Sequence, residues 1–117
     1  MYIKTIEFKK LKLNQGVIIN LDEFNEVALF LTQTGLHCVS NICPHQHFPK
    51  IYDGFVEEDT IRCSMHGWQF SLITGECLES GKAGINISGL KIFKCYEENG
   101  FVWIEKPETN NRPKWME

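Results

Sequence analysis

The amino-acid sequence predicts an all-β protein, folded as an antiparallel sandwich or barrel. Short runs rich in β-branched and aromatic residues recur along the chain, and Asn, Asp or Gly lies next to most of them. Apolar residues do not recur at helical spacing over any long segment. The chain has 117 residues, which suits a single domain around one core. Many short strands in one small domain are typical of a sandwich or a barrel.

The strands are expected, in chain order, at residues 2–8, 16–19, 27–31, 36–40, 55–56, 60–62, 69–71, 91–96 and 101–104. Glycine-containing turns are predicted at Gln33–Gly35, Ile73–Gly75 and Glu98–Gly100. The one helix candidate is Leu21–Glu26, which Asp22 could cap. It would form one turn at most, because so short a helix is marginal by itself.

Composition narrows the classes of function. With 43% hydrophobic and 23% charged residues, the chain is typical of a soluble globular protein. The formal net charge of −3 argues against a general nucleic-acid binder, which needs a basic surface. The longest apolar run, Val27–Leu31, is too short to cross a bilayer, and residues 1–4 lack the apolar segment of a signal peptide. We therefore expect a cytoplasmic protein that binds neither nucleic acid nor membrane.

Five cysteines are many for a reducing compartment and odd in number for a disulfide framework. Two of them lie in paired motifs, Cys43-Pro44-His45 and Cys63-Ser64-Met65-His66, with 17 residues between His45 and Cys63. Each motif places a thiolate and an imidazole on one loop, which are ligands for a soft metal centre. A single tetrahedral zinc ion could use all four side chains. A two-iron cluster fits better, because one iron can take both thiolates and the other both imidazoles.

With Gly67–Phe70 and Thr74-Gly75 after them, the two motifs resemble the cluster-binding signature of Rieske [2Fe–2S] proteins. The resemblance is closest to the soluble ferredoxins of ring-hydroxylating oxygenase systems, and it is strong over residues 43–75. It implies a small antiparallel β-sandwich that carries a cluster-binding subdomain. We therefore expect one domain over residues 1–105, a cluster-binding subdomain at about 42–82 and a polar, proline-broken tail over 106–117.

The resemblance also implies one [2Fe–2S] cluster per chain and its ligands. Cys43 and Cys63 would bind the inner iron, and His45 and His66 would bind the outer iron near the surface. No residue is expected to be catalytic.

The ligand set bears on the reduction potential. With two thiolates and two imidazoles the oxidised cluster is formally neutral, so that it accepts an electron more easily than a four-thiolate cluster. The potential therefore lies between roughly −150 and +300 mV, against about −400 mV for plant-type ferredoxins. High-potential relatives have a disulfide between the cluster loops and hydroxyl donors after the second loop. Phe48, Met65, Trp68 and Phe70 occupy the matching positions here. We therefore expect a potential near the low end of this range.

The function implied is that of a one-electron carrier and not of an enzyme by itself. It would take electrons from an NAD(P)H-dependent flavoprotein reductase and pass them to a terminal oxygenase. One alternative is a small Rieske subunit of a larger oxidoreductase, of the oxygenase or nitrite reductase type. Oxygen activation needs a separate iron site with two histidines and a carboxylate. Once His45 and His66 are used, only His37 and His47 remain, and the chain is too short for a second domain. A structural zinc module is the less favoured third reading.

The remaining cysteines and histidines have simpler interpretations. Cys38 and Cys95 fall in strand patterns and are expected to be small buried hydrophobes. Cys77 follows the cluster region, and nothing in its surroundings supports a reactive thiol. His37 is expected to be a surface or hydrogen-bonded sheet residue, and His47 an exposed loop histidine.

An acidic stretch separates the two motifs, formed by Asp53, Glu57, Glu58 and Asp59. Most runs of charge are solvated faces. This one could also steer a basic reductase, because weak electron-transfer encounters depend on electrostatics.

Overall fold

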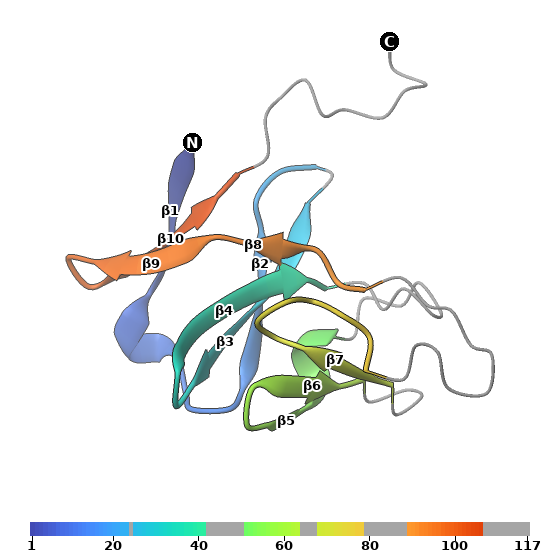
Figure 1. Ribbon diagram of the computed structural model, residues 1–117. Coiled ribbons are helices and arrows are strands. Elements are labelled where there is room, and N and C mark those ends of the chain that lie inside the picture. The colour runs from blue at the N-terminus through green and yellow to red at the C-terminus, as the bar shows by residue number, and fades with distance from the viewer. Residues whose placement is uncertain (24, 42–50, 64–67, 79–88, 107–117) are drawn as a thin grey trace, which may run out of the picture.

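The structure, a computed structural model, describes residues 1–23, 25–41, 51–63, 68–78 and 89–106 (Figure 1). The strand pairs of this part of the chain are antiparallel and form three sheets. The terminal sheet has the order β1 (Tyr2–Glu7), β10 (Phe101–Glu105), β9 (Cys95–Glu98). The central sheet has the order β2 (Gly16–Asn20), β3 (Glu26–Thr32), β4 (Gly35–Ser40), β8 (Ile92–Phe93). The small sheet has the order β5 (Phe55–Glu57), β6 (Thr60–Arg62), β7 (Gln69–Ser71).

Two 3₁₀ turns complete the described elements, η1 (Phe8–Lys10) and η2 (Ile51–Asp53). The expected first strand therefore ends one residue early, at Glu7, and the expected strand 91–96 is interrupted at Lys94. No helix among the described residues is long and apolar enough to cross a membrane. The predicted all-β class is confirmed.

The helix candidate at Leu21–Glu26 is wrong for the residues that the structure describes. Asn20 pairs with Glu26 at the end of the β2–β3 hairpin, so the chain must reverse direction between them. The Leu21 N–H donates to the Asn25 carbonyl at 2.8 Å, and the Asn25 side-chain amide donates to the Asp22 carboxylate at 3.0 Å. The carboxylate expected to cap a helix thus stabilises a hairpin loop.

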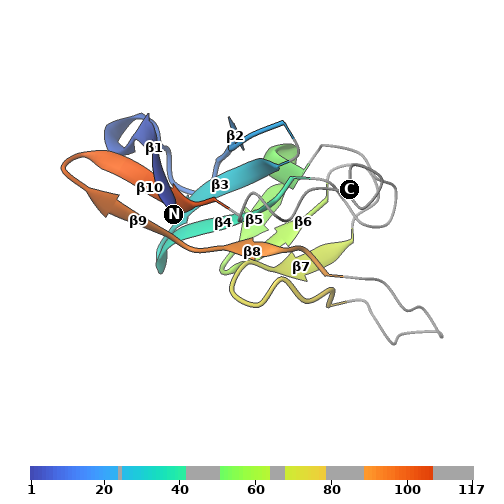
Figure 2. The ribbon, with the colours of Figure 1, turned by 90° about the horizontal axis from the view of Figure 1, so that it is seen from above.

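The central sheet is the middle layer, with the terminal sheet and the small sheet on opposite sides of it (Figures 1 and 2). Strand β3 shows why. Val27 and Leu29 face the core shared with the terminal sheet, and Ala28 and Phe30 face the core shared with η2 and the small sheet. All four side chains have 0% exposure. The continuously apolar run Val27–Leu31, without alternating polar residues, reflects the burial of β3 on both faces.

The core between the central and small sheets, here called the site core, is the one that concerns function. Its members are the buried residues Ala28, Phe30, Val39, Ile51, Ile61, Cys63, Phe70, Leu72, Cys77 and Leu90. Gly16 on β2 allows η2 to approach it closely, since a Cβ at this position would collide with the Tyr52 carbonyl oxygen and the Phe30 ring. A side chain at position 16 would therefore push η2 away from the sheet.

Candidate metal centre

Of the four predicted ligands, Cys63 lies within the described residues. It follows directly after β6, its exposure is 1%, and its side chain belongs to the site core. The Cys63 side chain therefore lies in the apolar layer between the central and small sheets, and its position is set by β6, which it directly follows. Cys43, His45 and His66 lie outside the described residues, as do His47, Phe48 and Met65.

The backbone closes the base of the second motif. The Cys63 N–H donates to the Trp68 carbonyl at 2.8 Å, which continues the antiparallel pairing of Arg62 with Gln69 in β6 and β7. The two described residues that flank 64–67, the segment with His66 in the sequence, are therefore hydrogen-bonded to each other. Trp68 is half-buried and packs against the site core, so part of its ring is covered.

A similar hydrogen bond closes the base of the first motif. The Ile51 N–H donates to the Asn41 carbonyl at 3.1 Å, so the described residues on either side of 42–50 are paired. Ile51 has 0% exposure and its side chain belongs to the site core, as the Cys63 side chain does. The described ends of the segments that carry Cys43, His45 and His66 are thus fastened to one layer of packed side chains.

The described residues on either side of 79–88 are also hydrogen-bonded to the fold, and Leu90 after this segment belongs to the site core. Before it, the Leu78 N–H donates to the Gln69 carbonyl at 2.8 Å; after it, the Leu90 N–H donates to the Gly75 carbonyl at 2.6 Å. Gly75 has a φ of +79°, and a Cβ there would collide with the Leu90 carbonyl oxygen. The glycine of the Thr74-Gly75 motif is therefore required by backbone geometry at the base of this segment.

The described cysteines fall into two kinds. Cys38, Cys63, Cys77 and Cys95 are all free thiols in the structure. Burial raises the pKa of Cys95 to about 11 and raises that of Cys38 above its usual range, with the neighbouring thiol adding to the effect on Cys38. These two thiols stay protonated at neutral pH and pack as hydrophobes. The prediction of burial is confirmed for Cys38, which is 1% exposed, whereas Cys95 is half-buried.

Cys77 also lies inside the protein, with 3% exposure, and its backbone forms an isolated antiparallel β-bridge with Phe70 at the edge of the small sheet. The sequence places it on a loop, but its side chain belongs to the site core. Within the described part of the chain, no three or more histidine, cysteine or acidic side chains gather as a metal site.

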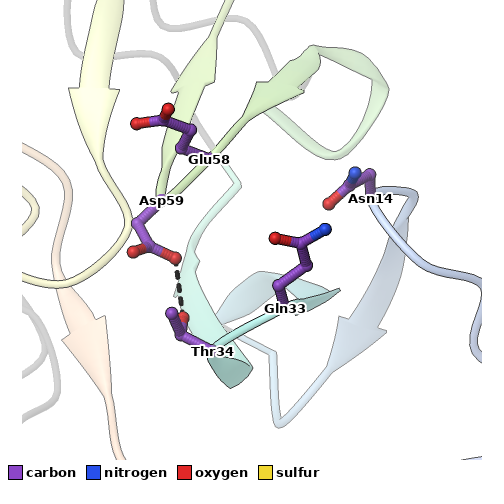
Figure 3. A pocket seen from close by; sticks show the side chains of 5 residues that line it. All are labelled: Asn14, Gln33, Thr34, Glu58 and Asp59. Atoms are coloured by element: carbon purple, nitrogen blue, oxygen red, sulfur yellow. Dashed lines mark hydrogen bonds between the residues drawn. The ribbon is translucent and has the colours of Figure 1, made fainter.

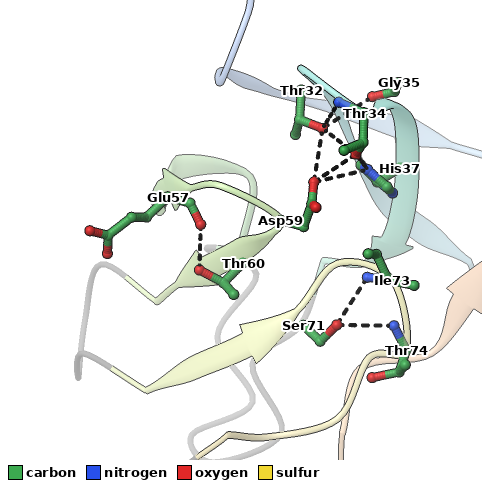
Figure 4. Close-up of polar contacts among 10 residues, drawn as sticks. All are labelled: Thr32, Thr34, Gly35, His37, Glu57, Asp59, Thr60, Ser71, Ile73 and Thr74. Carbon is green, nitrogen blue, oxygen red and sulfur yellow. Dashed lines mark hydrogen bonds and ion pairs between the residues drawn. The ribbon is translucent and has the colours of Figure 1, made fainter.

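His37 is a hydrogen-bonded sheet residue, as the sequence predicts. It lies on β4, its Nε2 atom is 2.9 Å from the Thr34 hydroxyl, and the Thr34 hydroxyl donates to the Asp59 carboxylate at 2.6 Å (Figure 4). Burial lowers the pKa of His37, and the nearby Asp59 carboxylate partly offsets that effect. No local pattern in the sequence signals this link, because it joins the β3–β4 turn to the β5–β6 turn, 25 residues away.

The Asp59 carboxylate is thus hydrogen-bonded to Thr34 and half-buried. Asp53, Glu57 and Glu58, the other members of the acidic stretch, are exposed. Glu58 and Asp59 line a polar pocket with Asn14, Gln33 and Thr34, on the side of the β3–β4 turn (Figure 3). The prediction of a solvated acidic face therefore holds for three of the four residues.

Comparison with known proteins identifies the family. Residues 4–94 match the model of the Rieske [2Fe-2S] domain, and the chain belongs to this family. Rieske domains of this description imply a [2Fe–2S] cluster.

Two curated relatives illustrate the range of the family. A stretch of 94 residues, 79% of this chain, is 34% identical to chlorophyllide a oxygenase of Oryza sativa and covers 17% of that protein. A second stretch of 68 residues, 58% of this chain, is 28% identical to the ferredoxin component of the alkene monooxygenase system of Xanthobacter autotrophicus and covers 56% of it. The chain spans about a fifth of the length of chlorophyllide a oxygenase and of another relative, cholesterol 7-desaturase of Hemicentrotus pulcherrimus.

Two solved structures share the fold. The small subunit of an NADH-dependent nitrite reductase from Mycobacterium tuberculosis has a TM-score of 0.81 at 19% identity, over 93% of this chain and 97% of that one. A chain in the complex of oxygenase and ferredoxin of carbazole 1,9a-dioxygenase has a TM-score of 0.75 at 17% identity, over 88% of this chain and 100% of that one. At these identities the likeness shows the Rieske fold, and it confirms the predicted β-sandwich class.

Proposed function

We propose that the protein is a Rieske-type ferredoxin that carries one electron at a time from a flavoprotein reductase to a terminal oxygenase. The observation that carries the proposal is the pair of Cys/His motifs in the sequence, together with the burial of Cys63 in the site core beside Ile51, the residue that follows the segment with the first motif. The ferredoxin component of an alkene monooxygenase system, among its relatives, supports it. So does the fold shared with a chain of the oxygenase–ferredoxin complex.

The residues fit the cluster that the family implies. Cys63 supplies a buried, unpaired thiol, and Cys43, His45 and His66 complete a set of two thiolates and two imidazoles. When bound, the cluster supplies reversible one-electron chemistry. We assign Cys43 and Cys63 to the inner iron and His45 and His66 to the outer iron. The apolar side chains of Ile51 and Leu90 are buried in the same core as Cys63.

The cluster itself is tested by visible and EPR spectra of protein purified without air or chelators. We expect a reddish-brown protein whose reduced EPR signal averages below the free-electron value. The matched variants are Cys63→Ser, which should lose the signal, and Cys38→Ser, which removes a buried thiol from the other core and should keep it. A colourless protein with stoichiometric zinc would refute the proposal and leave the zinc module.

The reduction potential is expected near the low end of the range between roughly −150 and +300 mV. Trp68 and Phe70 stand where hydroxyl groups would donate hydrogen bonds to the cluster sulfurs and raise the potential, and Phe70 is fully buried. A redox titration checks this expectation, and a midpoint above roughly +100 mV would contradict it. A low potential suits acceptance of electrons from a flavin.

A second candidate is a small Rieske subunit of a nitrite reductase assembly. The fold shared with the small subunit from Mycobacterium tuberculosis favours it. The two candidates differ in what the reduced protein does. A ferredoxin is reoxidised by an isolated terminal oxygenase during turnover, whereas a subunit co-purifies with its large catalytic partner and does not exchange electrons with an oxygenase.

A further inference from the structure

Asn41 is the most deeply buried polar side chain among the residues that the structure describes. Its exposure is 0%, and the other buried polar residue described is Thr32, with 4% exposure. Burying an amide costs free energy unless hydrogen bonds replace those lost with water. The partners of Asn41 therefore indicate what the buried amide holds in place.

These partners lie on two sides of Asn41. On β3, the Asn41 Nδ2 donates to the Glu26 carboxylate at 2.6 Å, and the Asn41 N–H donates to the Glu26 carbonyl at 3.2 Å. On η2, the Tyr52 N–H donates to the Asn41 Oδ1 at 2.8 Å, and the Ile51 N–H donates to the Asn41 carbonyl at 3.1 Å. One residue thus joins the first residue of β3 to the first two residues of η2.

The position of Asn41 in the chain gives these contacts their significance. Residues 42–50, which contain Cys43 and His45, begin directly after Asn41 and end directly before Ile51. Both ends of this segment are therefore fastened to one buried residue. The hydrogen bond from the Asn41 amide to a carboxylate is charge-assisted, which makes it stronger than one between neutral groups.

We propose that Asn41 is a positioning residue for the metal centre, acting with the Glu26 carboxylate. This inference rests on the proposed function, since it assigns Asn41 a role in presenting Cys43 and His45 to the cluster. By holding the two ends of residues 42–50 at fixed places on the site core, the Asn41 side chain reduces the conformations open to the two ligands. Groups that do not bind the metal themselves but hold its ligands in place commonly have a strong effect on metal affinity.

The test is a cycle of four full-length, cluster-containing proteins: wild type, Asn41→Asp, Glu26→Gln and the double variant. Asn41→Asp keeps the acceptor for the Tyr52 N–H but places a carboxylate against the Glu26 carboxylate. The double variant restores a hydrogen bond of opposite direction, from the amide at position 26 to the carboxylate at position 41, and keeps the net charge. The readouts are the rate of iron loss to a chelator, the reduced-state EPR g-values and the midpoint potential.

We expect Asn41→Asp to lose iron to the chelator roughly tenfold faster than wild type and to broaden or shift the g-values, and the double variant to recover both. Thr32→Val is the matched control. It removes the hydroxyl of the other buried polar residue, at the end of β3 opposite to Glu26, where Thr32 bonds to Thr34 and Asp59. It should destabilise the fold and leave the EPR signature and potential unchanged.

Several outcomes decide the matter. Unchanged iron release, g-values and potential in Asn41→Asp, or equal changes in Thr32→Val, would overturn the positioning role while the carrier function stands. Failure of the double variant to recover would do the same. If Asn41→Asp does not fold, Glu26→Ala breaks the same link without placing a new charge in the core, and the same faster iron release is expected. A wild-type protein without a cluster would overturn both the function and this inference.

Discussion

The tautomer of His37 is fixed by the groups around it. The Thr34 hydroxyl has one proton, which it donates to the acceptor-only carboxylate of Asp59 at 2.6 Å. The Thr34 oxygen can then only accept from His37, so the Nε2 atom, 2.9 Å away, carries the imidazole proton. A hydrogen-bonded chain therefore runs from β4 through the β3–β4 turn to the β5–β6 turn. It ties the central sheet to the small sheet, whose middle strand β6 is followed directly by Cys63.

This residue predicts a pH dependence of stability. Burial lowers the pKa of folded His37 below its ordinary value of 6.5, so the unfolded chain binds more protons in that region. Stability should therefore be fully present above pH 6.5 and should fall as the pH drops through 6.5 toward the lower folded pKa. His37→Gln, which can still donate to Thr34, should remove this component. The measurement is the denaturant midpoint of both proteins at about pH 7.5 and pH 5.5.

The other histidines serve as the internal reference for that comparison, since both proteins contain them. An identical loss of stability on acidification in wild type and His37→Gln would show that His37 does not contribute.

At the scale of elements, β3 organises the protein, because its two faces belong to two different cores. Leu29→Ala should lower the free energy of unfolding by about 2–5 kcal/mol and Phe30→Ala by about 3–5 kcal/mol, since both side chains are 0% exposed. Ile18→Thr on β2, at a position 39% exposed, should change it by less than about 0.5 kcal/mol. Chemical denaturation measures all three.

The two core variants should also differ in kind. Phe30 packs in the site core with Cys63, whereas Leu29 packs against the terminal sheet. At equal destabilisation, Phe30→Ala should disturb the reduced-state EPR signal more than Leu29→Ala does. The reverse order would contradict the assignment of the site core to the metal centre.

The local sequence was sufficient for most strands and for the two Cys/His motifs, because alternation, turn residues and ligand spacing are local properties. It was not sufficient for contacts between distant segments. The link from Thr34 to Asp59 and the buried bonds of Asn41 connect residues whose surroundings look ordinary in sequence. The Leu21–Glu26 helix failed for the same reason, since the pairing of Asn20 with Glu26 imposes a reversal. The ligand roles of Cys43, His45, Cys63 and His66 remain predictions.

At the scale of the whole molecule, the negative charge of the protein affects the rate at which it associates with a charged partner. The formal net charge is −3, and Asp53, Glu57 and Glu58 project from the small sheet and its adjoining turns into solvent. We expect the rate of reduction by a basic flavoprotein reductase to fall by roughly tenfold from low to high salt, because salt screens this attraction. Stopped-flow reduction at several salt concentrations measures it.

The matched variant is Glu57→Gln with Glu58→Gln, which removes two exposed charges and leaves the bound Asp59 in place. It should show a slower rate at low salt and a shallower salt dependence. A rate that does not depend on salt in the wild type would instead favour docking through apolar side chains.

The pairing of β1 with β10 has a practical consequence. Tyr2 lies opposite Glu105, and the Lys106 N–H donates to the Met1 carbonyl at 2.8 Å, so the two ends of the described fold leave it side by side. The domain can therefore be inserted into a surface loop of another protein without separating the two ends of that loop. If it is attached to an electrode at this edge, the terminal sheet faces the electrode. The site core lies on the other side of the central sheet, away from the attachment point.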